Sequence, residues 1–260
     1  MTSDVSVVIP YFNAEDTIVR ALNSVKEQTL AVNEVIIVND GSNLALLMEK
    51  IKQFKDCLNI ILIDLVVNFG AAYARNVGVR NSSGRFIAFL DADDVWHPKK
   101  IFIQYHFMYK TGSFLTCHRY TFNLNLQSLV VGELMHARRL RIFHFLWKNH
   151  VFTPTVMVVK EKFIDFDNRL TRSEDLKCWI SNFSNGDFFY LTLNLAGGYK
   201  RAVGESGLSG SYALMHKEYL NAWRYLFQEG VVGYLYYLVA MSVEYVKYPL
   251  RLSGSWLKRR

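Results

Sequence analysis

Cysteine is scarce in this sequence, and the three present, Cys57, Cys117 and Cys178, are an odd number without close spacing. This pattern predicts neither a disulfide framework nor a zinc site, and a reducing cytosol is the simple inference. The first ten residues include Asp4 and no long apolar stretch, so we do not expect a secretory signal. No low-complexity tract and no internal repeat occur.

Two phosphate-binding signatures are also missing. No G-x-G-x-x-G follows the first apolar run, and no G-x-x-x-x-G-K-[ST] occurs anywhere in the chain. A nucleotide phosphate would therefore not be held by a glycine loop, and another group must neutralise it.

The composition is that of a globular protein. The chain has 260 residues, of which 51% are hydrophobic, enough to bury a core as one large domain or as two closely joined ones. The net charge of +7 suits a protein that meets nucleic acid, a phosphorylated substrate or an anionic membrane.

The basic charge gathers at the end of the chain, in residues 247–260, which contain no acid. The apolar stretch before them, residues 230–246, is interrupted by Glu244 and is short for a bilayer span. Its tyrosines beside lysine and arginine indicate a helix in the headgroup region of a membrane. The alternative is a helix that packs on the core and has a frayed basic end. The basic residues are Lys247, Arg251, Lys258, Arg259 and Arg260.

Short β-branched runs and helical spacing alternate through the first hundred residues. Continuously apolar strands between helices predict an α/β fold with a parallel sheet covered on both faces. Pro98 is expected in the first turn of its helix. The expected strands are residues 5–9, 34–38, 59–63 and 86–90, and the expected helices are 16–28, 44–54, 71–79 and 98–110.

Polar residues follow each of these four strands. They include Asn13 after the first, Asp40 in N-D-G-S after the second, Asp64 at the end of the third and Asp91 after the fourth. Ligands bind at the carboxyl ends of parallel strands, so four polar endings together predict a shared crevice.

Asp91 and Asp93 place two carboxylates at i and i+2 after the fourth strand, where an extended chain points both to one side. Two hard oxygen ligands with open positions suit Mg²⁺ or Mn²⁺. Under the alternative interpretation, Asp94 and its neighbours cap the helix at Pro98, which leaves Asp91 unexplained.

Four ordered motifs now stand together: VSVVIPYFNAEDTI, EVIIVNDGS, NFGAAYARNVGV and FIAFLDADDVWHP. In this order and spacing they resemble the inverting glycosyltransferases of family 2, which have the GT-A fold with a mixed central sheet. The resemblance is strong over residues 4–110 and continues weakly to about 210.

This resemblance implies roles for individual residues. Asp91 and Asp93 would bind the cation that bridges the diphosphate of a nucleotide sugar, with Asp91 also on the sugar or ribose side. Asp40 would read the base, usually uracil, although an Asx turn before Gly41 is an alternative. The remaining donor-site residues are Pro10 and Tyr11, expected to line the nucleoside pocket, and Arg75, expected near the phosphates or else a solvated helix arginine.

The segment LTRSEDLKCW resembles the family's E-D-x-x-x-W motif. It implies that Asp175 is the general base and that Glu174 supports it, with Trp179 four residues after Asp175. The alternative is a capping box from Thr171 to Glu174, which would make Glu174 structural. Asp165 and Asp167 are poorer base candidates.

The segment at residues 197–210 resembles a lid that closes over the diphosphate, with Arg201 as a donor-site candidate, although the family's histidine is absent and the spacing is longer. It also carries Tyr199, Lys200, Ser206 and Ser209. The histidines at positions 118, 136, 144 and 150 show no metal-type pairing.

The resemblance implies transfer of a hexose from a UDP-sugar to a lipid-linked sugar on a polyprenyl diphosphate, with a β-linkage as product. It would serve O-antigen or capsule assembly, as a peripheral enzyme on the cytoplasmic face of the bacterial inner membrane, without a nucleic-acid partner. The alternatives are a nucleotidyltransferase and a non-catalytic nucleotide-sugar or membrane-binding module. We expect a nucleotide-sugar-binding half at 1–110, an acceptor-binding half of the same domain at 111–210, and a helical basic segment at 211–260.

Overall fold

The computed structural model describes residues 2–121, 136–198 and 212–258, with side chains up to Leu252. Nine strands of the described residues form one mixed sheet in the order β3-β2-β1-β4-β8-β6-β9-β5, and β7 pairs with β9. The strands are β1 Val5–Tyr11, β2 Glu34–Asn39, β3 Ile60–Asp64, β4 Phe86–Phe89, β5 Asp94–Trp96, β6 Leu115–Thr121, β7 Ala137–Arg139, β8 Met157–Val159 and β9 Phe188–Gly198.

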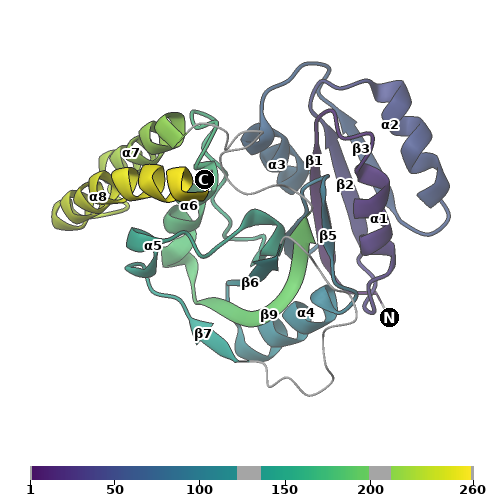
Figure 1. Ribbon diagram of the computed structural model, residues 1–260. Coiled ribbons are helices and arrows are strands. Elements are labelled where there is room, and N and C mark those ends of the chain that lie inside the picture. Colours follow the sequence, from purple (N-terminus) through teal and green to yellow (C-terminus); the bar gives the residue numbers. More distant parts are fainter. Residues whose placement is uncertain (1, 122–135, 199–211, 259–260) are drawn as a thin grey trace.

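Helices cover both faces of the parallel part of the sheet (Figure 1). Alternate residues of β1 face opposite sides: Val7 packs with the side chains of α1, α2 and α4, whereas Val8 packs with those of α3 and α6. The helices are α1 Ile18–Lys26, α2 Leu44–Ile51, α3 Ala71–Arg80, α4 Lys100–Thr111, α5 His144–Trp147, α6 Glu174–Ser181, α7 Tyr212–Gln228 and α8 Tyr234–Lys258.

Strands β3, β2, β1 and β4 pair in parallel, as the apolar runs predict. The helix expected from Pro98 begins two residues later, at Lys100, with Lys99 at its N-cap. The helix-capping interpretation of Asp94 is wrong, because Asp94 begins β5 and is buried.

The sheet continues beyond residue 110 through antiparallel neighbours. Strand β8 pairs with β4, and β9 reaches back to pair with β5, where Asp94 lies opposite Gly198. A Cβ atom at Gly198 would lie 2.2 Å from an oxygen of Asp94 and 2.3 Å from the hydroxyl of Tyr120. Only glycine fits there, so the long strand β9 holds the segment after the D-x-D motif in place.

Helices α7 and α8 lie side by side at the end of the molecule that also carries α5 and α6 (Figure 1). Glu244 of α8 is 1% exposed and forms ion pairs with Lys247 and Arg251. These two residues of the basic tail therefore neutralise a buried carboxylate of their own helix. The other three basic residues of the tail lie outside the described side chains.

The opposite face of α8 exposes apolar side chains. Leu235 is 78% exposed and Val246 is 56% exposed, and Tyr234 and Tyr245 are exposed beside them. Among the described helices, none is long and apolar enough to cross a bilayer.

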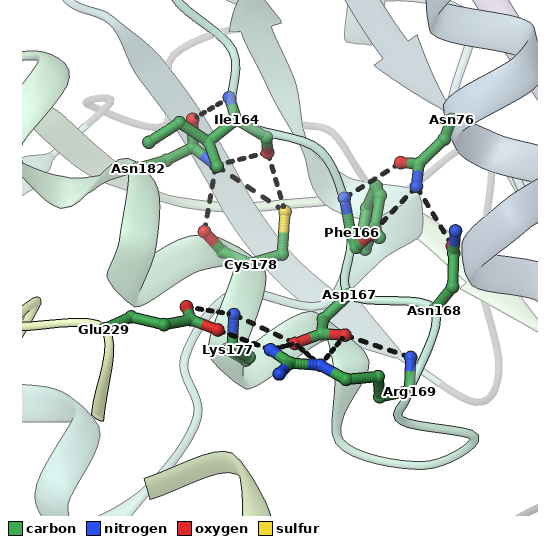
Figure 2. A network of polar contacts seen from close by, with 10 residues as sticks. All are labelled: Asn76, Ile164, Phe166, Asp167, Asn168, Arg169, Lys177, Cys178, Asn182 and Glu229. Carbon is green, nitrogen blue, oxygen red and sulfur yellow. Dashed lines mark hydrogen bonds and ion pairs between the residues drawn. The ribbon is translucent and has the colours of Figure 1, made fainter. Parts of the chain in front are cut away.

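Two asparagine side chains fasten the segment 163–170, which we call the strap, between α3 and α6 (Figure 2). The amide of Asn76 accepts from the N–H of Phe166 and donates to its carbonyl, both at 2.8 Å. The amide of Asn182 does the same for Ile164, at 2.7 and 2.8 Å. Each amide thus satisfies both backbone groups of one residue in a loop that has no sheet or helix partners of its own.

Four charged side chains fasten the end of the strap to α6 and α7 (Figure 2). Lys177 lies 3.0 Å from the carboxylate of Asp167 and 2.7 Å from that of Glu229, and Arg169 pairs with both acids. Opposite charges alternate in this network, so no member is left unpaired.

We predict that Asn76→Ala lowers the free energy of unfolding by about 2–3 kcal/mol, because it leaves buried backbone groups of Phe166 without partners. Urea denaturation measures this change. The control is Asn81→Ala on the same helix, whose exposed amide bonds only to the carbonyl of Val77, and which should change stability by less than about 0.5 kcal/mol. Equal losses in the two variants would contradict this account of the strap.

Candidate active site

The two acids of the D-x-D motif and the acid that follows it lie together after β4. One carboxylate oxygen from each of Asp91, Asp93 and Asp94 falls within 4.8 Å of the others. Asp94 accepts a hydrogen bond, at 2.7 Å, from the hydroxyl of Tyr120, which belongs to strand β6. Asp94 is therefore tied into the sheet, while Asp91 and Asp93 remain partly exposed.

These carboxylates fit a divalent cation. They offer hard oxygen ligands, which Mg²⁺ and Mn²⁺ prefer, and one open side for water or a substrate phosphate. The backbone between them is also fixed, because the guanidinium of Arg20 donates to the carbonyl oxygen of Asp93 at 2.8 Å. Asp91 and Asp93 are the residues that would hold the ion.

Arg75 joins this acidic group to the second acidic motif. Its guanidinium donates to Asp91 at 2.9 Å and to Glu174 at 3.0 Å. Arg75 is 5% exposed, so the interpretation as a solvated helix arginine is wrong. Burial lowers the pKa of Arg75, but the charges of Asp91 and Glu174 more than offset this and raise the pKa above its usual value.

The ring of Phe166 supports the same guanidinium, whose central carbon lies 5.4 Å from the ring centroid. Phe166 belongs to the strap and is held by Asn76, the residue after Arg75. Two neighbouring residues of α3 therefore act together. Asn76 positions the strap, and the strap places the ring of Phe166 against Arg75.

The segment of Asp175 opens α6 in an unusual way. Ser173 stands at the N-cap with φ 61°, and its side chain makes no capping hydrogen bond. The capping-box interpretation of Glu174 is wrong, because its carboxylate turns to Arg75 instead. The left-handed turn at Ser173 costs about 1 kcal/mol, and such strain is found at functional sites.

The carboxyl group of Asp175 lies beside that of Glu174 and is largely desolvated. It accepts a hydrogen bond from the Asn149 amide at 2.8 Å and one from the N–H of Leu176 at 2.7 Å. Burial raises the pKa of Asp175 to about 7, and the negative charge of Glu174 adds to the rise. A carboxylate with this pKa is suited to accept a proton at neutral pH.

The residues expected at the nucleoside lie near the ends of β1 and β2. Asp40 is 2% exposed, and its carboxylate accepts from the N–H groups of Phe69 and Gly70 at 2.7 and 2.9 Å. It thereby fixes the loop before α3, and the turn at residues 39–42 is closed by Asn39 instead. Base reading by Asp40 stays a prediction that rests on the remaining lone pairs of its oxygens.

Pro10 is partly exposed, whereas Tyr11, the last residue of β1, is fully buried in the core. The exposed aromatic at this strand end is its neighbour Phe12. Arg201 and the other residues of the expected lid at 199–211 lie outside the described residues.

Sequence reasoning missed three supporting residues: Asn149 beside Asp175, Tyr120 beside Asp94, and Phe166 under Arg75. Each lies far along the chain from its partner, so spacing gives no signal for it. Only Asn76, next to Arg75 in A-R-N-V-G, lies inside a motif that the sequence had singled out.

Comparison with known proteins agrees with this arrangement. The model of the family "Glycosyl transferase family 2" matches residues 6–166. A relative from Escherichia coli is the UDP-Glc:alpha-D-GlcNAc-diphosphoundecaprenol beta-1,3-glucosyltransferase WfgD, 29% identical over 246 residues, which cover 94% of this chain and 94% of that protein.

Two solved structures share the fold. S. aureus TarS 1–349 in complex with UDP-GlcNAc has a TM-score of 0.68 at 19% identity, and the match covers 86% of this chain and 66% of TarS 1–349. The mannosyltransferase PcManGT from Pyrobaculum calidifontis in complex with GDP-Man and Mn²⁺ has a TM-score of 0.65 at 15% identity, covering 98% of this chain and 72% of that one. At these identities the likeness shows the fold alone, and it confirms the expected GT-A fold.

We predict that Arg75→Gln lowers the free energy of unfolding by about 3–5 kcal/mol, because it leaves two carboxylates of a buried site without their counter-charge. Arg80→Gln on the same helix is the control, since Arg80 pairs with Asp165 and its side chain is 60% exposed. That change should cost less than about 1 kcal/mol. Chemical denaturation of both variants measures the difference. Similar losses in the free energy of unfolding would contradict the view that the ion pairs of Arg75 stabilise the site.

Proposed function

Because the chain belongs to glycosyl transferase family 2, we propose that it moves a hexose from a UDP-sugar to a sugar on a lipid-linked diphosphate and forms a β-linkage. One observation carries this proposal. Asp91 of the D-x-D segment and Glu174 of the E-D segment both bind Arg75, which supports a single site for the proposed donor-binding end and the proposed base.

The donor end would be completed by a divalent cation. Mn²⁺ or Mg²⁺ on Asp91 and Asp93 would offset the charge of the departing diphosphate. The loop held by Asp40 and the strand end at Pro10 would accommodate the nucleoside, which is uridine in our proposal. The protein's contribution is a rigid edge of the sheet that fixes these groups relative to one another.

The chemistry proposed for Asp175 is removal of one proton. The acceptor hydroxyl oxygen attacks the anomeric carbon as its proton passes to Asp175, while the bond from that carbon to the diphosphate oxygen breaks. Attack from the face opposite the leaving group inverts the centre, so an α-linked donor yields a β-linked product. Asn149 and the N–H of Leu176 orient the carboxylate.

The proposed acceptor is lipid-linked, as the name of WfgD states for that protein. The proposed role is assembly of a surface polysaccharide, such as O-antigen or capsule, by an enzyme lying on the cytoplasmic face of the inner membrane. The exposed apolar face of α8, with Leu235, Leu238 and Val246, supports a contact with the membrane surface. In the described part of α8 this contact would be apolar, since Lys247 and Arg251 bind Glu244.

We predict that Asp175→Asn reduces transfer by about 10²–10⁴-fold while UDP-sugar binding in the presence of Mn²⁺ is unchanged. Wild-type transfer should fall about tenfold per pH unit below pH 7, because the pKa of Asp175 is raised to about 7 and the protonated carboxyl group accepts no proton. Initial rates with UDP-glucose and a GlcNAc-diphosphate lipid, together with equilibrium dialysis of the donor, measure both effects.

The matched control is Asp165→Asn, a partly exposed acid that pairs with Arg80, and this variant should keep the wild-type rate. Persistent transfer by Asp175→Asn would remove Asp175 as the base. Donor binding by the wild type without transfer to any lipid-linked sugar would favour the binding-module alternative. Release of diphosphate from a nucleoside triphosphate, with its nucleotidyl group joined to a sugar phosphate, would favour the nucleotidyltransferase.

A further inference from the structure

Five basic side chains gather on the side of the site formed by β6, β7 and α5. Tyr190 of β9 lies among them: the guanidinium of Arg138 is 5.9 Å and the ring of His150 is 6.2 Å from its ring centroid. The ring of His144 lies 6.2 Å from that of His150. We call this group the basic cluster, and its members are Arg119, Arg138, His144, Lys148 and His150.

The charges of the basic cluster are not balanced within the described part of the chain, where none of its members forms an ion pair. Arg139, next to Arg138, shows the contrast, because it pairs with Asp187. Burial lowers the pKa of His150, and the positive charges of Arg138, Lys148 and His144 lower that pKa further. The positive field of the cluster therefore comes from its arginines and Lys148, and it attracts an anion. The lowered pKa keeps His150 mainly neutral at pH 7, where its ring can still donate a hydrogen bond.

The basic cluster adjoins the base. Asn149 donates to Asp175 at 2.8 Å, and the N–H of Val151 holds the same asparagine side chain at 3.0 Å. His150 lies between these two residues, and Lys148 precedes them. An anion on the cluster would therefore lie close to a sugar whose hydroxyl reaches Asp175.

Exposed aromatic side chains adjoin the basic cluster. Phe143, at the N-cap of α5, and Trp147 of α5 are 55% and 61% exposed, and Phe143 stacks on His144 while Lys148 follows Trp147 directly. Helix α8 packs against α5 and holds it: Tyr236 donates to the carbonyl of Ile142, and Lys247 to that of Leu146. A carboxylate, a group of cations and exposed aromatic rings thus adjoin one another around α5.

We propose that Arg138, Lys148 and His150 bind the diphosphate that joins the acceptor sugar to its lipid. This inference rests on the proposed function, because it takes Asp175 as the base and the acceptor as lipid-linked. The acceptor then lies along one line: its reacting hydroxyl at Asp175, its diphosphate on the cations, and the first part of its lipid beside Phe143 and Trp147. Arginine and lysine recognise diphosphate oxygens through charge-assisted hydrogen bonds.

The proposed site is separate from the donor diphosphate. The donor end would use acids and a cation after β4, whereas the basic cluster lies on β6, β7, α5 and the segment after α5 and contains no carboxylate. Binding of a diphosphate in the absence of divalent cations would therefore be assigned to the basic cluster and not to the donor end. The same phosphate chemistry is also found in anionic phospholipid headgroups, so the test must separate a lipid diphosphate from a membrane surface.

The first experiment is calorimetric titration of farnesyl diphosphate in EDTA, with farnesol as the control for the chain alone. We expect the wild type to bind the diphosphate but not farnesol, and Arg138→Gln or Lys148→Gln to weaken binding about tenfold. Arg139→Gln, which alters the neighbouring residue of β7, should leave binding unchanged. All three positions are exposed, and equal melting temperatures confirm that the variants fold. Absent binding, or equal binding by all variants, would overturn the inference.

The second experiment is flotation with phosphatidylglycerol vesicles that contain no acceptor. We expect Arg138→Gln to associate with them as the wild type does. A loss of vesicle binding as large as the loss of farnesyl diphosphate binding would assign the cluster to headgroups and overturn the inference.

Transfer assays separate this inference from the proposed function. With a short-chain GlcNAc diphosphate acceptor, Arg138→Gln should raise the acceptor KM about tenfold and leave the KM of the UDP-sugar unchanged. With the matching alkyl glycoside that lacks the diphosphate, wild type and variant should have the same KM. An equal change with both acceptors would refute the inference, while absent wild-type transfer alongside intact farnesyl diphosphate binding would refute the proposed function alone.

Discussion

The buried guanidinium of Arg75 carries one positive charge between two carboxylates that are 83 residues apart in the chain, Asp91 and Glu174. A charge in such a place is stable only when it is paired, and here two carboxylates share that one partner. The pairing therefore fixes the end of β4 relative to the start of α6. Phe166 lies against this guanidinium and is held by Asn76, so the strap, α3 and α6 form one unit around it.

The two neighbouring acids of α6 illustrate how environment separates function. Glu174 faces Arg75 and is paired, whereas Asp175 faces an amide and a backbone N–H, neither of which carries charge. Burial and the adjacent negative charge raise the pKa of Asp175 to about 7. An acid paired with arginine and an acid with a raised pKa therefore follow one another in sequence, which is the arrangement that the proposed support and base roles need.

The sequence indicates the parallel half of the fold well because its signals are local. Four apolar runs define β1 to β4, and the polar residues after each run lie where parallel strands place them. The D-x-D and E-D acids were likewise recognisable as motifs. Long-range pairing was not: Asn149 beside Asp175, Tyr120 beside Asp94 and the strap under Arg75 depend on tertiary contacts that no spacing encodes. The pairing of Lys247 and Arg251 with the buried Glu244 in α8 is likewise a matter of tertiary burial, which the sequence pattern of the tail does not reveal.

The proposed metal-dependent UDP-sugar site at Asp91 and Asp93 is tested most directly by the melting temperature of the protein. A ligand at about a hundred times its Kd adds about 2.7 kcal/mol to the native state, enough to shift the unfolding curve. UDP should raise the melting temperature of the wild type only when Mn²⁺ is present, and should leave Asp93→Ala unchanged under either condition. A shift by UDP that persists without Mn²⁺ or in Asp93→Ala, or no shift in the wild type at all, would contradict the account.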